Sequence, residues 1–344
     1  MWPYWLMYLA LAFPAMSATS SHRRILGWLS IGVVLILFIG LRHDVGGDWG
    51  NYLNHFRFIH YFSFNEVILE SDPGYKLLNW WVAKFGFGIY TVNLLCGAIF
   101  VAGLISFARR QPAPWLALTV AFPYLVLVVA MGYTRQGVAV GFILFALGAL
   151  ESRQFKRYLV YIALATLFHK TALIMIPLGF FLWGKGWLLR AVAIVAAAYV
   201  LFDLLVAEEV ESLWANYVDA QMLSQGARIR VFMNLVPSLI LLSFWRTWKN
   251  LFPDYWFWFW IAVGSVIVVL LVGVASTAVD RIALYFIPIQ IVVFSRLPSL
   301  VRNRSNADLI RYGIVFGYGL VLFVWLNYAT HAKYWIPYQN LLFL

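Results

Sequence analysis

Long runs of apolar residues are the feature that most constrains how this chain can fold. Several runs reach or closely approach the roughly 18 residues that mark a bilayer-crossing helix, including residues 25–41, 187–206, 255–275 and 309–328. Of the 344 residues, 63% are hydrophobic and only 11% are charged, whereas soluble domains carry roughly 25% charged residues. The runs therefore exclude a soluble fold and predict an all-α polytopic integral membrane protein.

The apolar runs divide the chain into about twelve predicted transmembrane helices. We expect them near residues 2–18, 25–41, 89–108, 114–131, 136–151, 157–169, 171–184, 187–206, 231–246, 255–275, 281–296 and 309–328. The pieces 157–169 and 171–184 are short, as in broken helices that line a cavity. A further amphipathic segment is expected over residues 76–87. The first run lacks a basic leader, so we interpret it as a retained helix and not a signal peptide.

The distribution of charge predicts the orientation of the helices. The formal net charge is +11, but the basic residues are scattered through short loops, which argues against nucleic-acid binding. With alternate loops on alternate sides, one side holds 15 of the 25 Lys and Arg and three of the 14 acids. The positive-inside rule makes that side cytoplasmic. Both termini and two larger loops, 42–88 and 207–230, are then outside, and residues 1–344 form a single transmembrane domain.

Ionisable residues gather at helix ends on the predicted outer side. A cation near a helix end can simply extend to lipid head groups. Arg135 and His169, however, lie within apolar sequence, where a charge needs a partner, a water-filled cavity or an anionic ligand. Because guanidinium groups bind phosphate in a bidentate manner, we predict an outward-facing diphosphate site. The outer group comprises Arg42, His43, Asp44, Asp48, Arg135, His169, Lys170, Arg228, Arg230, Asp280, Arg281, His331 and Lys333.

The segment 42–52, Arg-His-Asp-Val-Gly-Gly-Asp-Trp-Gly-Asn-Tyr, is the most distinctive of these polar stretches. Its three glycines permit a tight turn, which is expected to hold Asp44 and Asp48 close to Arg42. One interpretation is a solvated loop with an internal salt bridge of little energetic value. The other is a polar loop that caps a cavity and presents a carboxylate for acid–base chemistry.

Other chemistries have little support in the sequence. It contains no glycine-rich phosphate loop followed by Lys-Ser or Lys-Thr, and no nucleophile elbow. The histidines lack the spacing and the cysteine partners of a zinc site. A divalent metal between Asp44 and Asp48 stays an alternative, but we predict neither a metal nor a cofactor. The single cysteine, Cys96, lies in an apolar run and is expected to pack in the core.

Four short motifs resemble, in the same order, those of the EpsG-like branch of the Wzy polysaccharide polymerases. The resemblance covers about residues 40–290. Thr171 stands where serine is common in the family, which keeps the hydroxyl. The motifs are Arg42-x-x-x-Gly46-x-Asp48-x-x-x-Tyr52, Arg135-Gln136 at the start of a helix, Phe168-His169-Lys170-Thr171-Ala172-Leu173, and Asp280-Arg281-Ile-Ala-Leu-Tyr285.

The resemblance implies a membrane glycosyltransferase with a GT-C-like architecture. Such an enzyme transfers a growing glycan from undecaprenyl diphosphate onto another lipid-linked oligosaccharide repeat unit. The reaction extends O-antigen (the polymer of lipopolysaccharide), capsule or exopolysaccharide on the outer face of the bacterial cytoplasmic (inner) membrane. It needs no nucleotide sugar or other cofactor. The expected partners are the lipid-linked oligosaccharides, the bilayer and a polysaccharide chain-length regulator.

Roles for the individual residues follow from this hypothesis. We expect Arg135 and Arg281 to hold the diphosphate leaving group, together with one or both of Arg228 and Arg230, because fixed positive charge stabilises the developing anion. His169 is the first choice for the base that deprotonates the acceptor hydroxyl. Asp48 is the second choice and Asp44 the third. The other predicted substrate-binding residues are Arg42, Tyr52, Tyr133, Gln136, Lys170, Asp280 and Tyr285.

Two other classes of membrane protein also fit a cationic site. A transporter or flippase for an anionic lipid needs a cationic cavity, but its charges are expected near the middle of the membrane, and here they lie at helix ends. A membrane acyltransferase also uses a central histidine, but its lipid-side donor is commonly cytoplasmic. A purely structural subunit is the remaining alternative.

Overall fold

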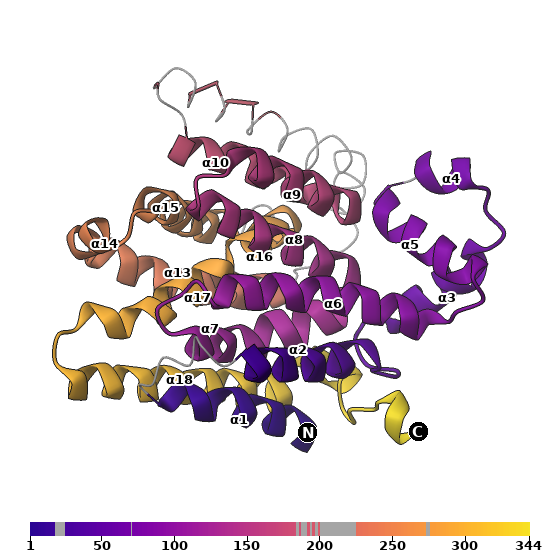
Figure 1. The fold of residues 1–344 in the computed structure, drawn as a ribbon, viewed down its shortest axis with the longest axis horizontal. Helices are drawn as coiled ribbons and strands as arrows, with labels where there is room; N and C mark the ends of the chain where they lie inside the picture. The colour runs from indigo at the N-terminus through magenta and orange to yellow at the C-terminus, as the bar shows by residue number, and fades with distance from the viewer. Residues whose placement is uncertain are drawn as a thin grey trace. The chain divides into compact units, whose positions relative to one another are not determined.

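The protein is described by a computed structural model that is helical throughout its described part, with no β-strand there (Figure 1). The described residues are 1–17, 25–69, 71–183, 225–272 and 276–344, with isolated positions between 186 and 199. They fall into two compact units. The first comprises Met1–Phe145, Leu164–Lys170 and Phe294–Leu344, and the second comprises Ala146–Ala163 and Thr171–Val293.

The first unit contains most of the predicted outer polar residues. Its apolar helices are α1 (Trp2–Met16), α2 (Ile25–Gly40), α6 (Ile89–Ala108), α7 (Pro114–Ala121) and α18 (Arg304–Tyr328). Its shorter elements are α3 (Trp49–Ile59), α4 (Phe64–Leu69), α5 (Pro73–Lys84), the π-helical η2 (Phe122–Ala130), and the 3₁₀ turns η5 (Leu297–Leu300), η6 (Thr330–Tyr334) and η7 (Leu341–Phe343).

The second unit is built around α13 (Gln225–Ser243), which packs against α15 (Tyr255–Leu271) and α16 (Ser276–Phe286). It also contains α10 (Met175–Trp183) and α14 (Trp245–Leu251). Elements with residues in both units are α8 (Thr134–Glu151), α9 (Phe155–Phe168), η3 (Lys170–Ile174) and α17 (Pro288–Arg296).

Glycines allow close helix packing inside the first unit. A Cβ atom on Gly103 of α6 would lie 2.1 Å from the carbonyl oxygen of Gly141 in α8, and a Cβ on Gly40 of α2 would lie 2.7 Å from the Leu94 backbone of α6. Small residues at such crossings are typical of helices packed within membranes, where close backbone approach supplies van der Waals contact.

Four helices in the described part of the chain are long and apolar enough to cross a membrane. They are Ile89–Ala108, Thr134–Glu151, Ile282–Leu300 and Arg304–Tyr328; the pair Ile229–Ser243 and Trp245–Leu251, bent by 80°, makes a fifth if counted as one span. The shorter apolar helices are Ile25–Gly40, Pro114–Ala130, Lys170–Gly179 and Tyr255–Leu271. Large apolar side chains such as Phe13 and Phe316 are 81% and 68% exposed, as expected for surfaces that face lipid.

Helices occur at most of the predicted positions, but only four or five in the described residues qualify as spans by length and composition, so about twelve spans are not confirmed. The predicted helix 187–206 lies outside the described residues, apart from isolated positions. The predicted helix 114–131 changes at Phe122 from an α-helix to a π-helix, where Pro123 cannot donate a backbone hydrogen bond. The segment 281–296 starts five residues earlier than predicted and breaks between α16 and α17 at Pro288.

The described parts of the two predicted outer loops contain helices. Residues 42–88 are mostly helical, because α3, α4 and α5 lie there, and α5 overlaps the expected amphipathic segment 76–87. Most of the loop 207–230 lies outside the described residues, but its end forms the first turn of α13. The helices α3 and α4 escaped prediction because they are too polar to stand out as apolar runs.

The C-terminal tail binds the segment that follows α2. The amide of Gly46 donates to the Tyr334 carbonyl at 2.9 Å, and the amide of Leu341 donates to the Leu41 carbonyl at 2.8 Å. The Trp335 indole is 1% exposed and donates to the Leu127 carbonyl at 2.9 Å. Tyr4 of α1 donates to the Trp335 carbonyl at 2.6 Å. Residues near both ends of the chain therefore meet in the first unit.

We predict that Gly46→Ala destabilises this end of the protein. Gly46 has a φ of +108°, and a Cβ there would lie 2.5 Å from the Met131 carbonyl oxygen. The strain is expected to cost roughly 1–3 kcal/mol, seen as a lower melting temperature of the purified protein in detergent. Gly50→Ala is the matched control, because a Cβ there meets nothing within 4 Å. Equal melting temperatures for the two variants would show that the turn tolerates the change.

Candidate active site

A buried arginine, Arg42, joins two helix ends at the polar end of the first unit. Arg42 is 1% exposed; its guanidinium donates to the carbonyls of Ile39 at 2.6 Å and Val45 at 3.3 Å, and to the Thr134 hydroxyl at 2.8 Å. These three bonds tie the end of α2 to the start of α8, where Arg135 follows. Arg42 therefore holds the loop.

The expected pairing of Arg42 with Asp44 and Asp48 is wrong. Arg42 forms no ion pair with a described carboxylate; its guanidinium donates instead to backbone and hydroxyl oxygens. Asp44 is exposed, with a left-handed φ of 48°. The cation that acts on Asp48 is Arg135.

The centre of the site is a carboxylate that the sequence analysis did not select. Asp72 is 7% exposed and immediately precedes α5. Its Oδ2 accepts a hydrogen bond from Arg135 Nη1 at 2.9 Å, and its Oδ1 accepts one from the Lys170 amide at 3.2 Å. The Nδ1 of His169 lies 3.7 Å from Oδ2. Asp72 therefore brings together the Arg135 motif and the His169 motif, which are far apart in the sequence.

A second polar neighbour of His169 is Gln136. The Nε2 of His169 lies 3.4 Å from the amide Nε2 of Gln136. Because an amide nitrogen can only donate, a hydrogen bond here needs an unprotonated Nε2 on the imidazole. The Nδ1 of His169 faces Asp72 but is buried without a hydrogen-bond partner among the described residues, so the ring lies between Asp72 and Gln136.

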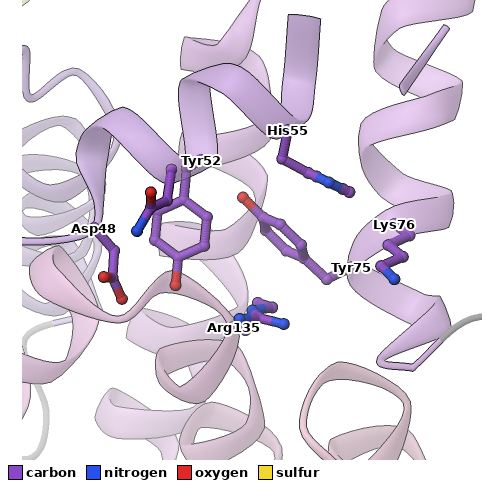
Figure 2. Close-up of a pocket in the computed structure, with 7 residues that line it drawn as sticks. Asp48, Tyr52, His55, Tyr75, Lys76 and Arg135 are labelled. Carbon is purple, nitrogen blue, oxygen red and sulfur yellow. The ribbon is translucent and has the colours of Figure 1, made fainter. Parts of the chain in front are cut away.

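A polar pocket of about 190 Å³ lies beside this cluster (Figure 2). In Figure 2, Asp48 and Tyr52 lie on one side of Arg135 and Lys76 lies on the other. Pockets for drug-sized ligands have about 300–1,000 Å³, so this space fits a head group or one sugar and not a whole oligosaccharide. Its lining residues are Asp48, Asn51, Tyr52, His55, Tyr75, Lys76 and Arg135.

The two carboxylates have opposite pKa shifts. Burial raises the pKa of Asp48, and the charge of Arg135 and a hydrogen bond from Asn51 only partly offset this effect. Burial also acts to raise the pKa of Asp72, but the contact with His169, the charges of His169 and Arg135, and the Lys170 amide outweigh it, so this pKa is lowered. The Tyr52 pKa is raised to about 12, chiefly by burial and then by the charge of Asp48. Asp48 is thus the carboxylate that takes up a proton more readily.

Other predicted residues belong to the second unit. Arg230 Nη1 and Asp280 Oδ2 form an ion pair of 2.8 Å between α13 and α16. The hydroxyls of Thr171 and Tyr285 lie 3.0 Å apart and are buried, which fits a packing role. Arg228 and Arg281 lie in α13 and α16, but their side chains are outside the described residues.

The remaining predictions concern Tyr133 and metals. Tyr133 is partly exposed just before α8 and does not line the pocket described above. Within the described residues, no group of three or more His, Cys, Asp or Glu side chains is arranged to hold a metal ion. Asp44 and Asp48 therefore have no third ligand of these types in that part of the chain.

Asp72 and several of the residues that line the pocket were missed by the sequence analysis. Asp72, Tyr75 and Lys76 occur in Ser-Asp-Pro-Gly-Tyr-Lys, where an aspartate before a proline is a typical helix start. That signal predicts α5 but gives no reason to place Asp72 beside Arg135. His55 and Asn51 lie on α3, which was interpreted as loop.

The comparisons with known proteins agree with the motifs. A family model described as the EpsG family matches residues 25–340, nearly the whole chain. No curated protein and no solved structure shows a significant match.

We predict that Asp72→Asn loosens the cluster and changes its response to acid. Hydrogen bonds to charged groups contribute roughly 1.5–3 kcal/mol, but Arg135 is 41% exposed, so we expect a loss of about 1–2 kcal/mol after solvent screening. Because the folded-state pKa of Asp72 is lowered, its contribution is complete above the unfolded pKa of about 3.9 and is lost as pH falls through the folded value.

The measurement is the melting temperature of wild type and variant between pH 3 and pH 7. Asp72→Asn should lower it at pH 7 and have a smaller effect at the acid end. Asp44→Asn is the control, because Asp44 is exposed and asparagine tolerates its left-handed backbone. A pH-independent effect of Asp72→Asn would contradict the ionised state of the carboxylate.

Proposed function

The chain belongs to the EpsG family, and we propose that it is a membrane glycosyltransferase that polymerises lipid-linked oligosaccharides. The substrate is an undecaprenyl-diphosphate-linked repeat unit, and the product is a longer glycan for O-antigen or another surface polysaccharide. The observation that carries the proposal is Arg135, which lines the pocket and is held by Asp72 next to His169.

The proposed reaction needs a cation for the leaving group and a base for the acceptor. The acceptor hydroxyl attacks the anomeric carbon of the donor glycan, the bond from that carbon to the diphosphate oxygen breaks, and the hydroxyl proton passes to the base. Arg135 stabilises the diphosphate that departs, because a fixed guanidinium needs little reorganisation as the charge develops. Lys76 adds a second positive charge to the same pocket.

The geometry favours Asp48 over His169 as the base. Asp48 lines the pocket, and its raised pKa brings it closer to the working pH, which favours proton transfer. The His169 side chain is 15% exposed and faces Asp72 and Gln136, so we assign it a positioning role for Arg135 through Asp72. Arg228, Arg230, Asp280 and Arg281 stay proposed substrate-binding residues on the family resemblance alone.

We further propose about twelve spans in a GT-C-like arrangement, with the pocket facing the outside of the bacterial cytoplasmic membrane. The charge asymmetry of the loops supports this orientation. A transporter is less well supported, because the pocket residues lie in α3 and the residue before it and in the first turns of α5 and α8, and not in the middle of a candidate membrane span. A chain-length regulator is the proposed protein partner.

The proposed function predicts that the purified protein converts a synthetic undecaprenyl-diphosphate-linked repeat unit into a ladder of longer products. No nucleotide sugar and no other protein is added. Arg135→Ala should reduce the ladder about 100-fold or more, as the loss of one preorganised stabilising group commonly does, and His169→Ala should also reduce it, because Arg135 is then less firmly positioned. Gel separation of a fluorescent repeat unit provides the measurement.

Arg57→Ala and His60→Ala are the matched controls, because both side chains are exposed beside the same segment and neither lines the pocket. They should give normal ladders. Normal ladders from both Arg135→Ala and His169→Ala would show that the site is assigned wrongly. Movement of the lipid between leaflets without any ladder would instead identify a transporter.

The assignment of the base predicts a specific pH dependence. Asp48 must be ionised to accept a proton, and its raised pKa moves the acid-side loss of activity above the usual aspartate value of about 3.9. Asp48→Asn should give low activity without this acid limb. If the limb persists in Asp48→Asn but disappears in His169→Gln, the base is His169; if it disappears only in Asp44→Asn, the base is Asp44.

A further inference from the structure

The connection between α13 and α15 in the second unit turns sharply through a short helix. α14 is bent by 80° from the residues Ile229–Ser243 of α13, and α15 then packs back along α13 (Figure 1). If α13 and α15 run through the bilayer, α14 must lie close to the membrane plane. This orientation is typical of helices at the lipid–water interface.

The side chains of this turn, residues 244–260, divide into a buried set and an exposed aromatic surface. Trp248 is 0% exposed and fixes α14 against the rest of the unit. Five other large apolar side chains of the turn are exposed by 40–54%, whereas Tyr255, Phe257 and Trp258 are buried. These exposed side chains are Phe244, Trp245, Leu251, Trp256 and Trp260. Tryptophan is enriched where membrane and water meet.

Two cations lie among these aromatic rings. The guanidinium of Arg246 is 5.3 Å from the Trp245 ring centroid, and the Nζ of Lys249 is 5.5 Å from that of Trp256. Neither cation forms an ion pair with another described residue. The nearby acid, Asp254, is buried and accepts a hydrogen bond from Trp258 at 2.7 Å. The exposed charge of the turn is therefore positive.

We propose that this turn, the α14 surface, binds the phosphate of an anionic phospholipid in the leaflet beside it. Arg246 and Lys249 supply the charge, the guanidinium fork matches phosphate oxygens, and the exposed rings lie at the depth of the head groups. The charge asymmetry of the loops puts the turn on the cytoplasmic side, whose anionic surface attracts basic residues next to the membrane. This binding is separate from the proposed catalytic pocket and does not depend on it.

The test titrates the purified full-length protein in neutral detergent with phosphatidylglycerol, phosphatidylcholine of the same acyl chains, or inorganic phosphate. Native mass spectrometry counts the bound lipid, and the melting temperature reports stabilisation. Phosphatidylglycerol should bind wild type more tightly than phosphatidylcholine does. Arg246→Gln/Lys249→Gln should weaken that binding by about fivefold for each charge removed.

The matched control is Arg302→Gln/Arg304→Gln, which removes two exposed arginines on the same predicted side. It should bind phosphatidylglycerol as wild type does, and Arg246→Lys/Lys249→Arg should retain binding. Three results would overturn the proposal: unchanged binding in Arg246→Gln/Lys249→Gln, equal binding of phosphatidylcholine, or equal stabilisation by inorganic phosphate. The first places the lipid elsewhere, the second makes the contact purely apolar, and the third indicates a free anion.

Discussion

The arrangement of the polar end depends on the need of one buried carboxylate for hydrogen-bond donors. An ionised carboxylate out of water is unstable unless it is paired and hydrogen-bonded. Asp72 meets this need with the Arg135 guanidinium and the Lys170 amide, and the His169 ring lies 3.7 Å away. These partners come from the start of α8 and the residues after α9, so one side chain brings the ends of three helices together. The pocket forms where they meet, with Arg135 shared between pocket and cluster.

A second set of contacts keeps this end in place. The buried guanidinium of Arg42 joins the end of α2 to the start of α8, and the C-terminal tail holds the segment after α2 by backbone hydrogen bonds at His43 and Gly46. Backbone groups in such a segment need partners wherever water is excluded. The tail supplies those partners, so the last residues of the chain support the loop that carries Asp48.

Much of the architecture could be predicted because apolar helices show up as continuous runs. The bounds predicted for α2 and α6 differ from the observed ones by at most one residue. The prediction failed for α3 and α4, which are short and pack on their neighbours, and it covered α5 only in part, as the amphipathic segment 76–87. Arg135 and His169 stood out in the sequence because a charge within an apolar run needs a partner, and the structure places both beside Asp72. Asp72 and Lys76 did not stand out, because they lie in an ordinary polar segment.

The sequence by itself determined that this chain is a helical membrane protein, since no soluble core can bury so many apolar runs, and its ordered motifs indicated the family that the family model then matched. Tertiary structure decided which charges meet. Arg42 lies only six residues from Asp48, yet it binds backbone and hydroxyl oxygens, whereas Asp72 and Arg135 pair across 63 positions. Sequence spacing cannot predict such pairs, because the partner of a charge depends on which donors and acceptors the folded helices bring within reach.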